Sequence, residues 1–183
     1  MTKRLTILAT GGAGFIGSHV VVELIAAGHC VVILDNFENA SPEVPARLRR
    51  ITGSDVPTVR GDVRDRDLVQ SVLVRYGIDA VIHLAGKKAV GESVAQPLMY
   101  YESNLGGGIT LLEAMQATKV GKLLFSSSAT VYAPGESPMD EDHPVAPSNP
   151  YGRTKLMLED IITDAVAASA LQSAISLRYF NPV

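Results

Sequence analysis

The chain has little cysteine, no tryptophan and no strong excess of charge of either sign. Its 183 residues include a single cysteine, Cys30, and the formal net charge is −3. A lone cysteine excludes an internal disulfide, and its apolar surroundings predict a buried, inert thiol in a reducing, cytoplasmic setting. The scattered, balanced charges argue against a nucleic-acid surface or a membrane-binding patch, so we expect no nucleic acid and no membrane as partners.

Long apolar runs and metal-ligand spacings are missing as well. Lys3 and Arg4 precede an apolar stretch as in a signal peptide, but Thr10 and Gly11 interrupt that stretch too early. No segment approaches the ~20 apolar residues that a membrane-spanning helix requires. His83 stands alone in an apolar run, where a hydrogen-bonded core histidine is the expected role, and we predict no metal site.

Short apolar runs alternate with longer amphipathic segments along the whole chain. Strands are predicted at residues 5–10, 30–34, 57–60, 79–84, 122–126 and 174–179, and helices at 15–27, 44–51, 65–76, 99–118 and 151–169. Continuous apolar strands that alternate with helices predict a doubly wound parallel sheet of the Rossmann-like α/β class, built as one domain over residues 1–183. Residues 85–97 and the proline-rich residues 133–150 are expected to be loops after strand ends, where ligands bind in such sheets.

The first strand leads into a glycine-rich turn, Gly11-Gly12-Ala13-Gly14-Phe15-Ile16-Gly17. Gly11 permits a tight turn, Gly14 lets the backbone approach a pyrophosphate, and Gly17 lets the helix pack closely on the strand. The free N–H groups at the helix start then receive negative charge. By itself the turn is also explained as a backbone that needs positive φ.

An acidic residue at the end of the second strand supports the dinucleotide interpretation. Asp35 follows Gly17 by 18 residues, close to the ~20 of a ribose-binding carboxylate. A carboxylate there accepts hydrogen bonds from ribose hydroxyls and repels a 2′-phosphate, which favours NAD over NADP. Asp62, after the third strand, has two open roles, a contact with adenine or a cap for the following helix.

Tyr151 and Lys155 share one face of the last predicted helix, since they are four residues apart. An ammonium near the phenol, together with the positive charge of oxidised NAD, is expected to lower the pKa of Tyr151 so that it takes a proton from a substrate hydroxyl. Ser128 follows the fifth strand and can hydrogen-bond the reacting oxygen. Spacing alone would also fit an ordinary surface pair; the order of strand, serine, loop and Tyr-x-x-x-Lys favours catalysis.

The spacing Gly-x-x-Gly-x-x-Gly resembles the short-chain dehydrogenase/reductase superfamily. Several blocks along the chain look more specifically like the UDP-glucose 4-epimerases of its extended branch, namely residues 33–36, 81–86, 88–94, 125–132 and 177–182. The resemblance implies a bound NAD that removes hydride from C4 of a UDP-hexose, rotation of the keto sugar, and return of hydride to its other face. It also implies a possible homodimer through the helices near residues 99–118 and 151–169.

The resemblance assigns roles to individual residues. Ser128 and Tyr151 would act on the sugar hydroxyl, Lys155 would hold the nicotinamide ribose, and Asn181 would lie beside the substrate. The NAD contacts that it implies, beyond the glycines of the turn, are Phe15, Ile16, Asp35, Asn36, Asp62, Val63, Leu84, Ala85, Gly86, Lys88, Ser103, Tyr151, Lys155 and Phe180. Lys87 is expected to be a solvated loop lysine.

Three positions depart from the family pattern. Ser103 stands where these epimerases place an NAD-contacting asparagine, with Asn104 directly after it, and Ala133 replaces a glycine. The run Gly106-Gly107-Gly108 falls within a predicted helix, which three glycines weaken by about 1 kcal/mol each relative to alanine. Close approach of the backbone to the cofactor or to a neighbouring helix would account for them.

A related reaction, 4,6-dehydration of a nucleotide sugar, requires an acidic pair directly after the strand-end hydroxyl. Ala129 and Thr130 stand there and cannot supply it. Two functional interpretations therefore stay open. In one, the sequence represents an epimerase and is a piece of it, since epimerases of this type continue for nearly as long again. In the other, the chain is a complete NAD-binding module without its own substrate pocket.

Overall fold

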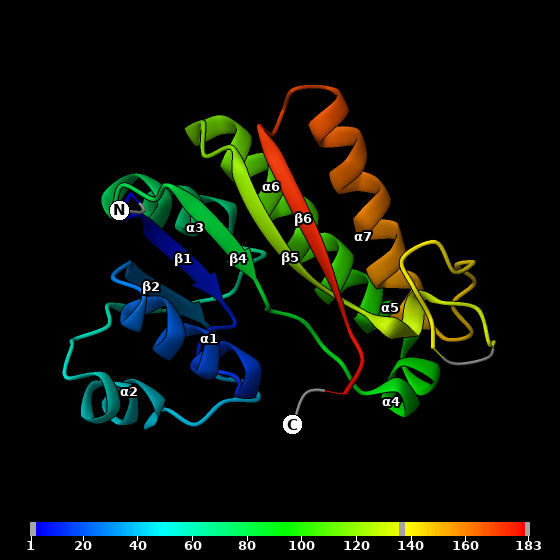
Figure 1. Ribbon diagram of the computed structural model, residues 1–183, viewed down its shortest axis with the longest axis horizontal. Helices are drawn as coiled ribbons and strands as arrows, with labels where there is room; N and C mark the ends of the chain where they lie inside the picture. The colour runs from blue at the N-terminus through cyan, green and yellow to red at the C-terminus, as the bar shows by residue number, and fades with distance from the viewer. Residues whose placement is uncertain (1–2, 136–137, 182–183) are drawn as a thin grey trace.

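The computed structural model describes residues 3–135 and 138–181. Its centre is a six-stranded sheet in the order β3-β2-β1-β4-β5-β6, with every neighbouring pair parallel. The strands are β1 (Thr6–Thr10), β2 (Cys30–Asp35), β3 (Thr58–Arg60), β4 (Ala80–His83), β5 (Lys122–Ser128) and β6 (Ser173–Tyr179). The predicted doubly wound parallel sheet is confirmed (Figure 1).

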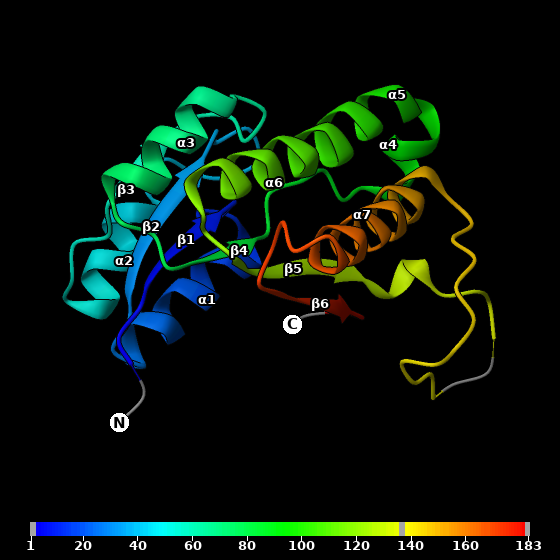
Figure 2. The same cartoon turned by 90° about the horizontal axis from the view of Figure 1, so that it is seen from above.

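Helices make the crossovers between the strands. The longer ones are α1 (Phe15–Ala26), α2 (Val44–Thr52), α3 (Arg66–Arg75), α6 (Gly107–Thr118) and α7 (Pro150–Ala167). The short ones are α4 (Val90–Ala95), α5 (Pro97–Tyr100), the π-helix η1 (Tyr101–Gly106) and the 3₁₀ turn η2 (Ala129–Val131). Helices α3, α6 and α7 lie along one face of the sheet, and α1 and α2 lie on the other (Figures 1 and 2).

Alternate residues of the central strands point into two separate cores. Leu8 and Val32 pack with the residues of α3, α6 and α7, whereas Ala9 and Ile33 pack with those of α1 and α2. This is the period of two that a strand imposes on its side chains. Both faces of β1 and β2 are therefore buried, which is why their sequences read as continuous apolar runs.

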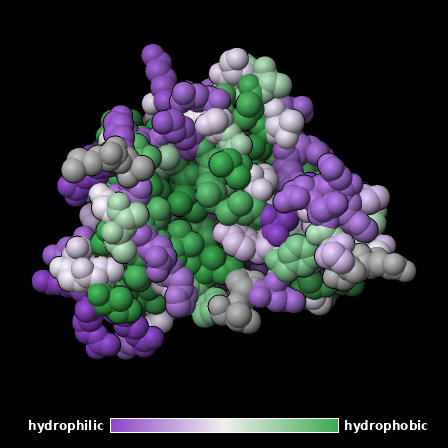
Figure 3. Space-filling view, viewed as in Figure 1, coloured by the Kyte–Doolittle hydropathy of each residue, from purple (hydrophilic) through white to green (hydrophobic). Residues whose placement is uncertain are grey.

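The sheet is not covered equally on both sides. No helix of the described part of the chain lies in front of β5 and β6 in Figure 1. The side chains of Ile175 and Leu177 on β6 are 59% and 37% exposed, and a broad apolar surface is visible over this part of the molecule (Figure 3).

The segment predicted as one helix over residues 99–118 is divided into three. A π-helical stretch, η1, stands between α5 and α6, so an extra residue enters the helix between Tyr101 and Gly106. Helix propensity cannot predict such an insertion, because it depends on contacts on both sides of the helix. π-Helical turns of this kind are frequent at functional sites.

The glycine run is explained by a neighbouring helix and a neighbouring loop. A Cβ atom on Gly108 would lie 2.5 Å from Cδ2 of Leu158 in α7, and one on Gly107 would lie 2.8 Å from Cγ1 of Val63. Gly106 meets nothing within 4 Å. Two of the three glycines thus allow α6 to approach α7 and the loop after β3, as one of the two explanations proposed for them requires.

Three other expectations need correction. Residues 85–97 are not entirely loop, because they contain the six-residue helix α4. Strand β5 continues to Ser128, because its last three residues pair with β6 through the register that ends at Ser128 and Tyr179. Cys30 is only partly buried at the start of β2, and the guanidinium of Arg4 donates a hydrogen bond to its Sγ at 3.0 Å.

Candidate active site

The glycine turn is suited to bind a negatively charged ligand at the start of α1. Gly11 has φ of 70°, and a Cβ on it would lie 2.6 Å from the backbone N of Ala85. A Cβ on Gly17 would collide with the carbonyl oxygen of Gly11. Gly14, at the N-cap, supplies no side chain to the first N–H groups of the helix, so these donors stay available to a ligand.

Asp35 lies at the end of β2 and is 8% exposed. Its two carboxylate oxygens accept hydrogen bonds from the backbone N–H of Ala13 at 3.0 Å and of Phe37 at 2.9 Å. An ionised carboxylate can accept about four hydrogen bonds. The two that remain can receive the hydroxyls of a ribose, and the backbone holds the carboxylate in position for them.

A pocket opens at the carboxyl ends of β1, β2, β3 and β4, where the strand order reverses its direction between β1 and β4. Ligands of open α/β sheets bind at this place. The lining includes every predicted cofactor-binding residue except Tyr151, Lys155 and Phe180. Lining residues that the sequence did not single out are Leu34, Glu38, Asn39, Ala40, Gly61, Lys87 and Ser126.

Of the two roles left open for Asp62, the capping role is contradicted, and the contact with adenine stays a prediction. The N-cap of α3 is Asp65, whose side chain accepts a hydrogen bond from the N–H of Leu68, so the capping role of Asp62 is wrong. Asp62 instead accepts hydrogen bonds from the backbone N and the guanidinium of Arg64. The side-chain hydrogen bond from Arg64 is the main reason that the pKa of Asp62 falls to about 2. A fixed carboxylate therefore lines the pocket at neutral pH.

Ser128 and Tyr151 are brought together by the start of α7. The side chain of Asn149 caps this helix by accepting from the N–H of Gly152 at 2.9 Å, and a Cβ on Gly152 would lie 2.6 Å from the carbonyl oxygen of Thr130. The helix start therefore packs directly on the turn after β5. Burial raises the pKa of the Tyr151 phenol, and a side-chain hydrogen bond with Ser128 acts in the opposite direction.

Lys155 is buried one turn further along α7. Its Nζ donates to the carbonyl oxygen of Ser126 at 2.9 Å and lies 4.9 Å from the ring centroid of Phe125. A Cβ on Gly86 would lie 3.8 Å from this Nζ, so the ammonium reaches the wall of the pocket. Burial lowers the pKa of Lys155 to about 8, opposed by the charge of Glu159.

The predicted lowering of the Tyr151 pKa is wrong for the protein alone. Lys155 Nζ is 5.9 Å from the centroid of the Tyr151 ring and is directed at a carbonyl oxygen. Desolvation of the phenol is the largest influence on its pKa and raises it. A positive charge close to the phenol would oppose this effect.

The adjacent residues Ser103 and Asn104 have different roles, one in the pocket wall and one in joining elements of the protein. Ser103 lines the pocket. Asn104 is 4% exposed, and its side chain forms hydrogen bonds with other parts of the protein. Its side chain accepts from the N–H of Lys87 at 2.8 Å, donates to the carbonyl of Lys87 at 3.0 Å and donates to Thr154 at 3.1 Å. Asn104 thus joins the loop after β4 to α7.

The end of β6 lies apart from the dinucleotide pocket. Phe180 is 60% exposed and stacks on Tyr132 at 6.2 Å, and Asn181 is exposed. The structure does not bring them to the pocket that Asp35 lines. Tyr132 is 8% exposed, and the guanidinium of Arg178 lies 4.9 Å from the centre of its ring.

His83 is the core residue that was predicted. It is buried, and its Nδ1 lies 2.7 Å from Oγ1 of Thr10. Burial lowers its pKa to about 3, so the ring is neutral. Within residues 3–135 and 138–181, no cluster of three or more histidine, cysteine or acidic side chains could hold a metal ion. The same residues contain no helix that is long and apolar enough to cross a membrane.

Comparison with known proteins agrees with this geometry. Residues 7–183 match the model of the NAD dependent epimerase/dehydratase family. The chain belongs to this family. It is 53% identical over 179 residues to the UDP-glucose 4-epimerase of Bacillus subtilis, an alignment that covers 97% of the chain and 53% of that protein.

Two solved structures of the family superimpose on nearly the whole chain. One is a UDP-glucose 4-epimerase from Stenotrophomonas maltophila with bound NAD and formylated UDP-arabinopyranose, at 46% identity and a TM-score of 0.95, covering 98% of this chain and 54% of that one. The other is the Bifidobacterium longum enzyme in complex with NAD+ and UDP, at 48% identity and a TM-score of 0.94, covering 97% and 54%. The chain therefore spans about half the length of the relatives it matches.

Sequence reasoning missed Glu38 and Lys87 in the wall of the pocket. Lys87 was expected to be solvated, but its side chain is only 13% exposed and its Nζ lies 2.5 Å from Oε1 of Glu38. The two residues are far apart in the sequence, and only the strand order brings them together. The one available signal was that each lies within four residues of a strand end on the ligand-binding edge of the sheet.

Proposed function

We propose that this protein binds NAD in the described pocket and interconverts UDP-glucose and UDP-galactose by transient oxidation at C4 of the hexose. The observation that carries the proposal is the meeting of Ser128, Tyr151 and Lys155 beside a pocket built for a dinucleotide. The family to which the chain belongs is described as NAD dependent. The relatives named above are UDP-glucose 4-epimerases.

The residues present fit NAD. The turn from Gly11 to Gly17 leaves no room for side chains at its first and last positions, and the uncapped start of α1 offers N–H donors to a pyrophosphate. The carboxylate of Asp35 has free acceptor capacity for ribose hydroxyls and would repel the additional phosphate of NADP. The chemistry that NAD supplies when bound is reversible acceptance of a hydride.

Tyr151 moves the proton in the proposed reaction. Its phenolate oxygen accepts the proton of the sugar 4-hydroxyl as the C4 hydride leaves, and returns this proton to the same sugar oxygen when hydride comes back to the other face of the rotated keto sugar. Burial raises the pKa of Tyr151, and the positive charges of Lys155 and of oxidised nicotinamide, when bound, would favour the phenolate.

Ser128 positions the reacting oxygen. Its Oγ accepts hydrogen bonds from the backbone N and the Oγ1 of Thr130, at 3.2 and 2.9 Å. These donors leave the Ser128 proton free to point toward Tyr151 or the sugar. The same geometry argues against dehydration, because Thr130 is engaged with Ser128 and Ala129 has no acidic group.

The test is the change Tyr151→Phe in the protein expressed at its natural length. It should lower the rate of UDP-galactose conversion by 10²–10⁴-fold, the usual contribution of a general acid–base, while NAD binding measured by calorimetry stays within a few-fold. Tyr76→Phe, at the end of α3, is the matched control and should keep full activity. Retained activity in Tyr151→Phe would refute the proton-transfer role.

We also propose a cytoplasmic protein of galactose and nucleotide-sugar metabolism that forms a homodimer through α6 and α7. Support for the dimer comes from Ile109 and Met157, apolar side chains on these helices that are 40% and 42% exposed. Sedimentation velocity of the protein expressed at its natural length should give a dimer that Met157→Glu dissociates. A monomer at micromolar concentration would contradict this part of the proposal.

A further inference from the structure

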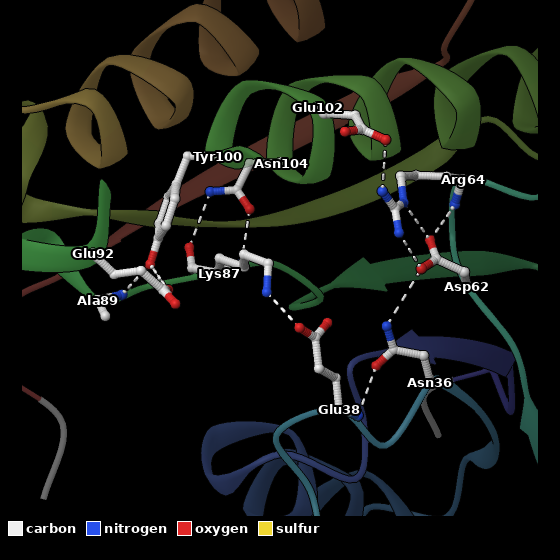
Figure 4. A network of polar contacts seen from close by, with 10 residues as sticks. All are labelled: Asn36, Glu38, Asp62, Arg64, Lys87, Ala89, Glu92, Tyr100, Glu102 and Asn104. Atoms are coloured by element: carbon white, nitrogen blue, oxygen red, sulfur yellow. Dashed lines mark hydrogen bonds and ion pairs between the residues drawn. The ribbon is translucent and has the colours of Figure 1, made fainter. Parts of the chain in front are cut away.

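A chain of polar contacts runs along the rim of the dinucleotide pocket and joins the loops that follow β2, β3 and β4 to η1 (Figure 4). In the first half of this chain, Lys87 Nζ contacts Glu38 Oε1 at 2.5 Å, and the backbone N of Glu38 donates to Oδ1 of Asn36 at 3.0 Å. Asn104 of η1 holds Lys87 through both its backbone N and its backbone O.

The second half returns to η1. Asn36 Nδ2 donates to Asp62 at 3.4 Å, and Asp62 accepts from the guanidinium of Arg64 at 2.8 Å. The other side of that guanidinium donates to Glu102 of η1 at 3.0 Å. The circuit is closed, since Glu102 and Asn104 both belong to η1. The π-helical segment thus connects the two ends of the rim.

The contact between Lys87 and Glu38 differs from the others because it crosses the pocket. Glu38 follows β2 and Lys87 follows β4, and β1 lies between these strands in the sheet. A bond between the two loops therefore passes over the carboxyl end of β1, where the glycine turn begins. Both residues line the pocket.

The position of Lys87 is fixed in advance of any ligand. Its backbone is bonded on both sides to Asn104, which is itself bonded to Thr154 of α7. Its side chain is 13% exposed, whereas that of Glu38 is 54% exposed. The lysine is thus the fixed side of the contact, and the loop of Glu38 is the side that can move away.

We propose that the Lys87–Glu38 ion pair is a clasp that closes the pocket over bound NAD and slows its release. The proposal rests on the NAD binding proposed above. Opening the pair would separate the loop after β2 from the loop after β4 and free the path out of the pocket. A partly exposed ion pair has a modest strength, so its loss should change the rate of release by roughly 3- to 10-fold and leave the fold unchanged.

The charges distinguish a clasp from a simple phosphate-binding lysine. If Lys87 only attracted the pyrophosphate, removal of the Glu38 charge would free the lysine and slow NAD release. If the pair is a clasp, the same change opens the pocket and speeds release. The substitution Glu38→Gln therefore has opposite effects under the two explanations.

The experiment measures dissociation by stopped flow, with NADH bound to the purified protein and displaced by excess NAD. Glu38→Gln and Lys87→Met should each raise the dissociation rate, and the double variant should be no faster than the faster single one. The exchanged pair, Glu38→Lys with Lys87→Glu, should recover most of the slow release. Glu43→Gln breaks an exposed ion pair with Arg47 in α2 and serves as the matched control.

Ionic strength provides a second measurement. The wild-type dissociation rate should rise with added salt, and the rate of Glu38→Gln should rise less, because the screened pair is already absent. An unchanged or slower release in Glu38→Gln, with a melting temperature equal to that of the wild type, would overturn the clasp. A wild-type protein that binds neither NADH nor NAD would overturn the proposed cofactor site and the clasp with it.

Discussion

Lys155 is a buried ammonium that keeps its charge at a cost in stability. Its pKa is lowered from 10.5 to about 8 by burial. Below pH 8 the lysine is protonated in both the folded and the unfolded chain, so the folded protein bears the full cost of a desolvated charge. Between pH 8 and about 10.5 the unfolded chain binds a proton that the folded chain has released. The contribution of Lys155 to the free energy of unfolding therefore increases with pH across this window.

The prediction concerns the difference between the wild type and Lys155→Met. The free energy of unfolding of the wild type minus that of Lys155→Met should increase by an amount on the order of 3 kcal/mol between pH 8 and 10.5. Urea unfolding at several pH values measures it, and titrations elsewhere in the protein cancel. Lys122→Met, at an exposed position of β5, should run parallel to the wild type. Parallel curves for Lys155→Met would contradict the prediction.

The site residues that sequence reasoning found are those whose function depends on local backbone. Gly11, Gly17 and Asp35 are recognisable because a turn and a strand end determine where they point. Lys87 and Asn104 were not recognisable, because their contacts depend on which strand lies beside which. The raised pKa of Tyr151 was missed for a related reason, since burial of the phenol comes from the packing of η2 and α7 and leaves no mark in the spacing of residues.

At the scale of elements, alternation of apolar runs was sufficient to predict all six strands and the five long helical segments. The short helix α4 was not predicted, because Gly86, Gly91 and Pro97 favour a loop and its six residues show too little periodicity. The π-helix η1 was also missed. It directs Asn104 toward α7 and Ser103 toward the pocket. Helix-propensity scales do not describe such contacts between elements.

Gly106, the last residue of η1, and Gly108 of α6 provide a matched test of helix packing. Gly108→Ala should lower the free energy of unfolding by about 1–3 kcal/mol, because the new methyl group would overlap Leu158 in a packed core. Gly106→Ala should raise it by roughly 0.5–1 kcal/mol, since Gly106 has helical dihedral angles and open space around it. Chemical denaturation of both variants measures these two changes in the free energy of unfolding. Equal effects of the same sign would show that packing against α7 does not determine the need for glycine.

At the scale of the whole molecule, the two faces of β6 differ. Arg178 and Ala174 point toward α7, where Arg178 pairs with Glu159 at 2.7 Å and Ala174 packs against the core. Ile175 and Leu177 lie on the opposite face, because side chains alternate along a strand. Figures 1 and 3 show that face open and apolar. Contiguous exposed apolar surface favours association with other surfaces of the same kind.

We therefore expect the purified 183-residue chain to self-associate through the outer face of β6. Ile175→Thr keeps a β-branched side chain, and with it the strand, but removes apolar surface. It should lower the associated fraction in sedimentation velocity several-fold and reduce the fluorescence of a bound apolar dye. Ile51→Thr on α2, where the isoleucine is 67% exposed, makes the same chemical change outside this face and should alter neither signal. If both variants lowered association equally, general hydrophobicity and not the face of β6 would be the cause.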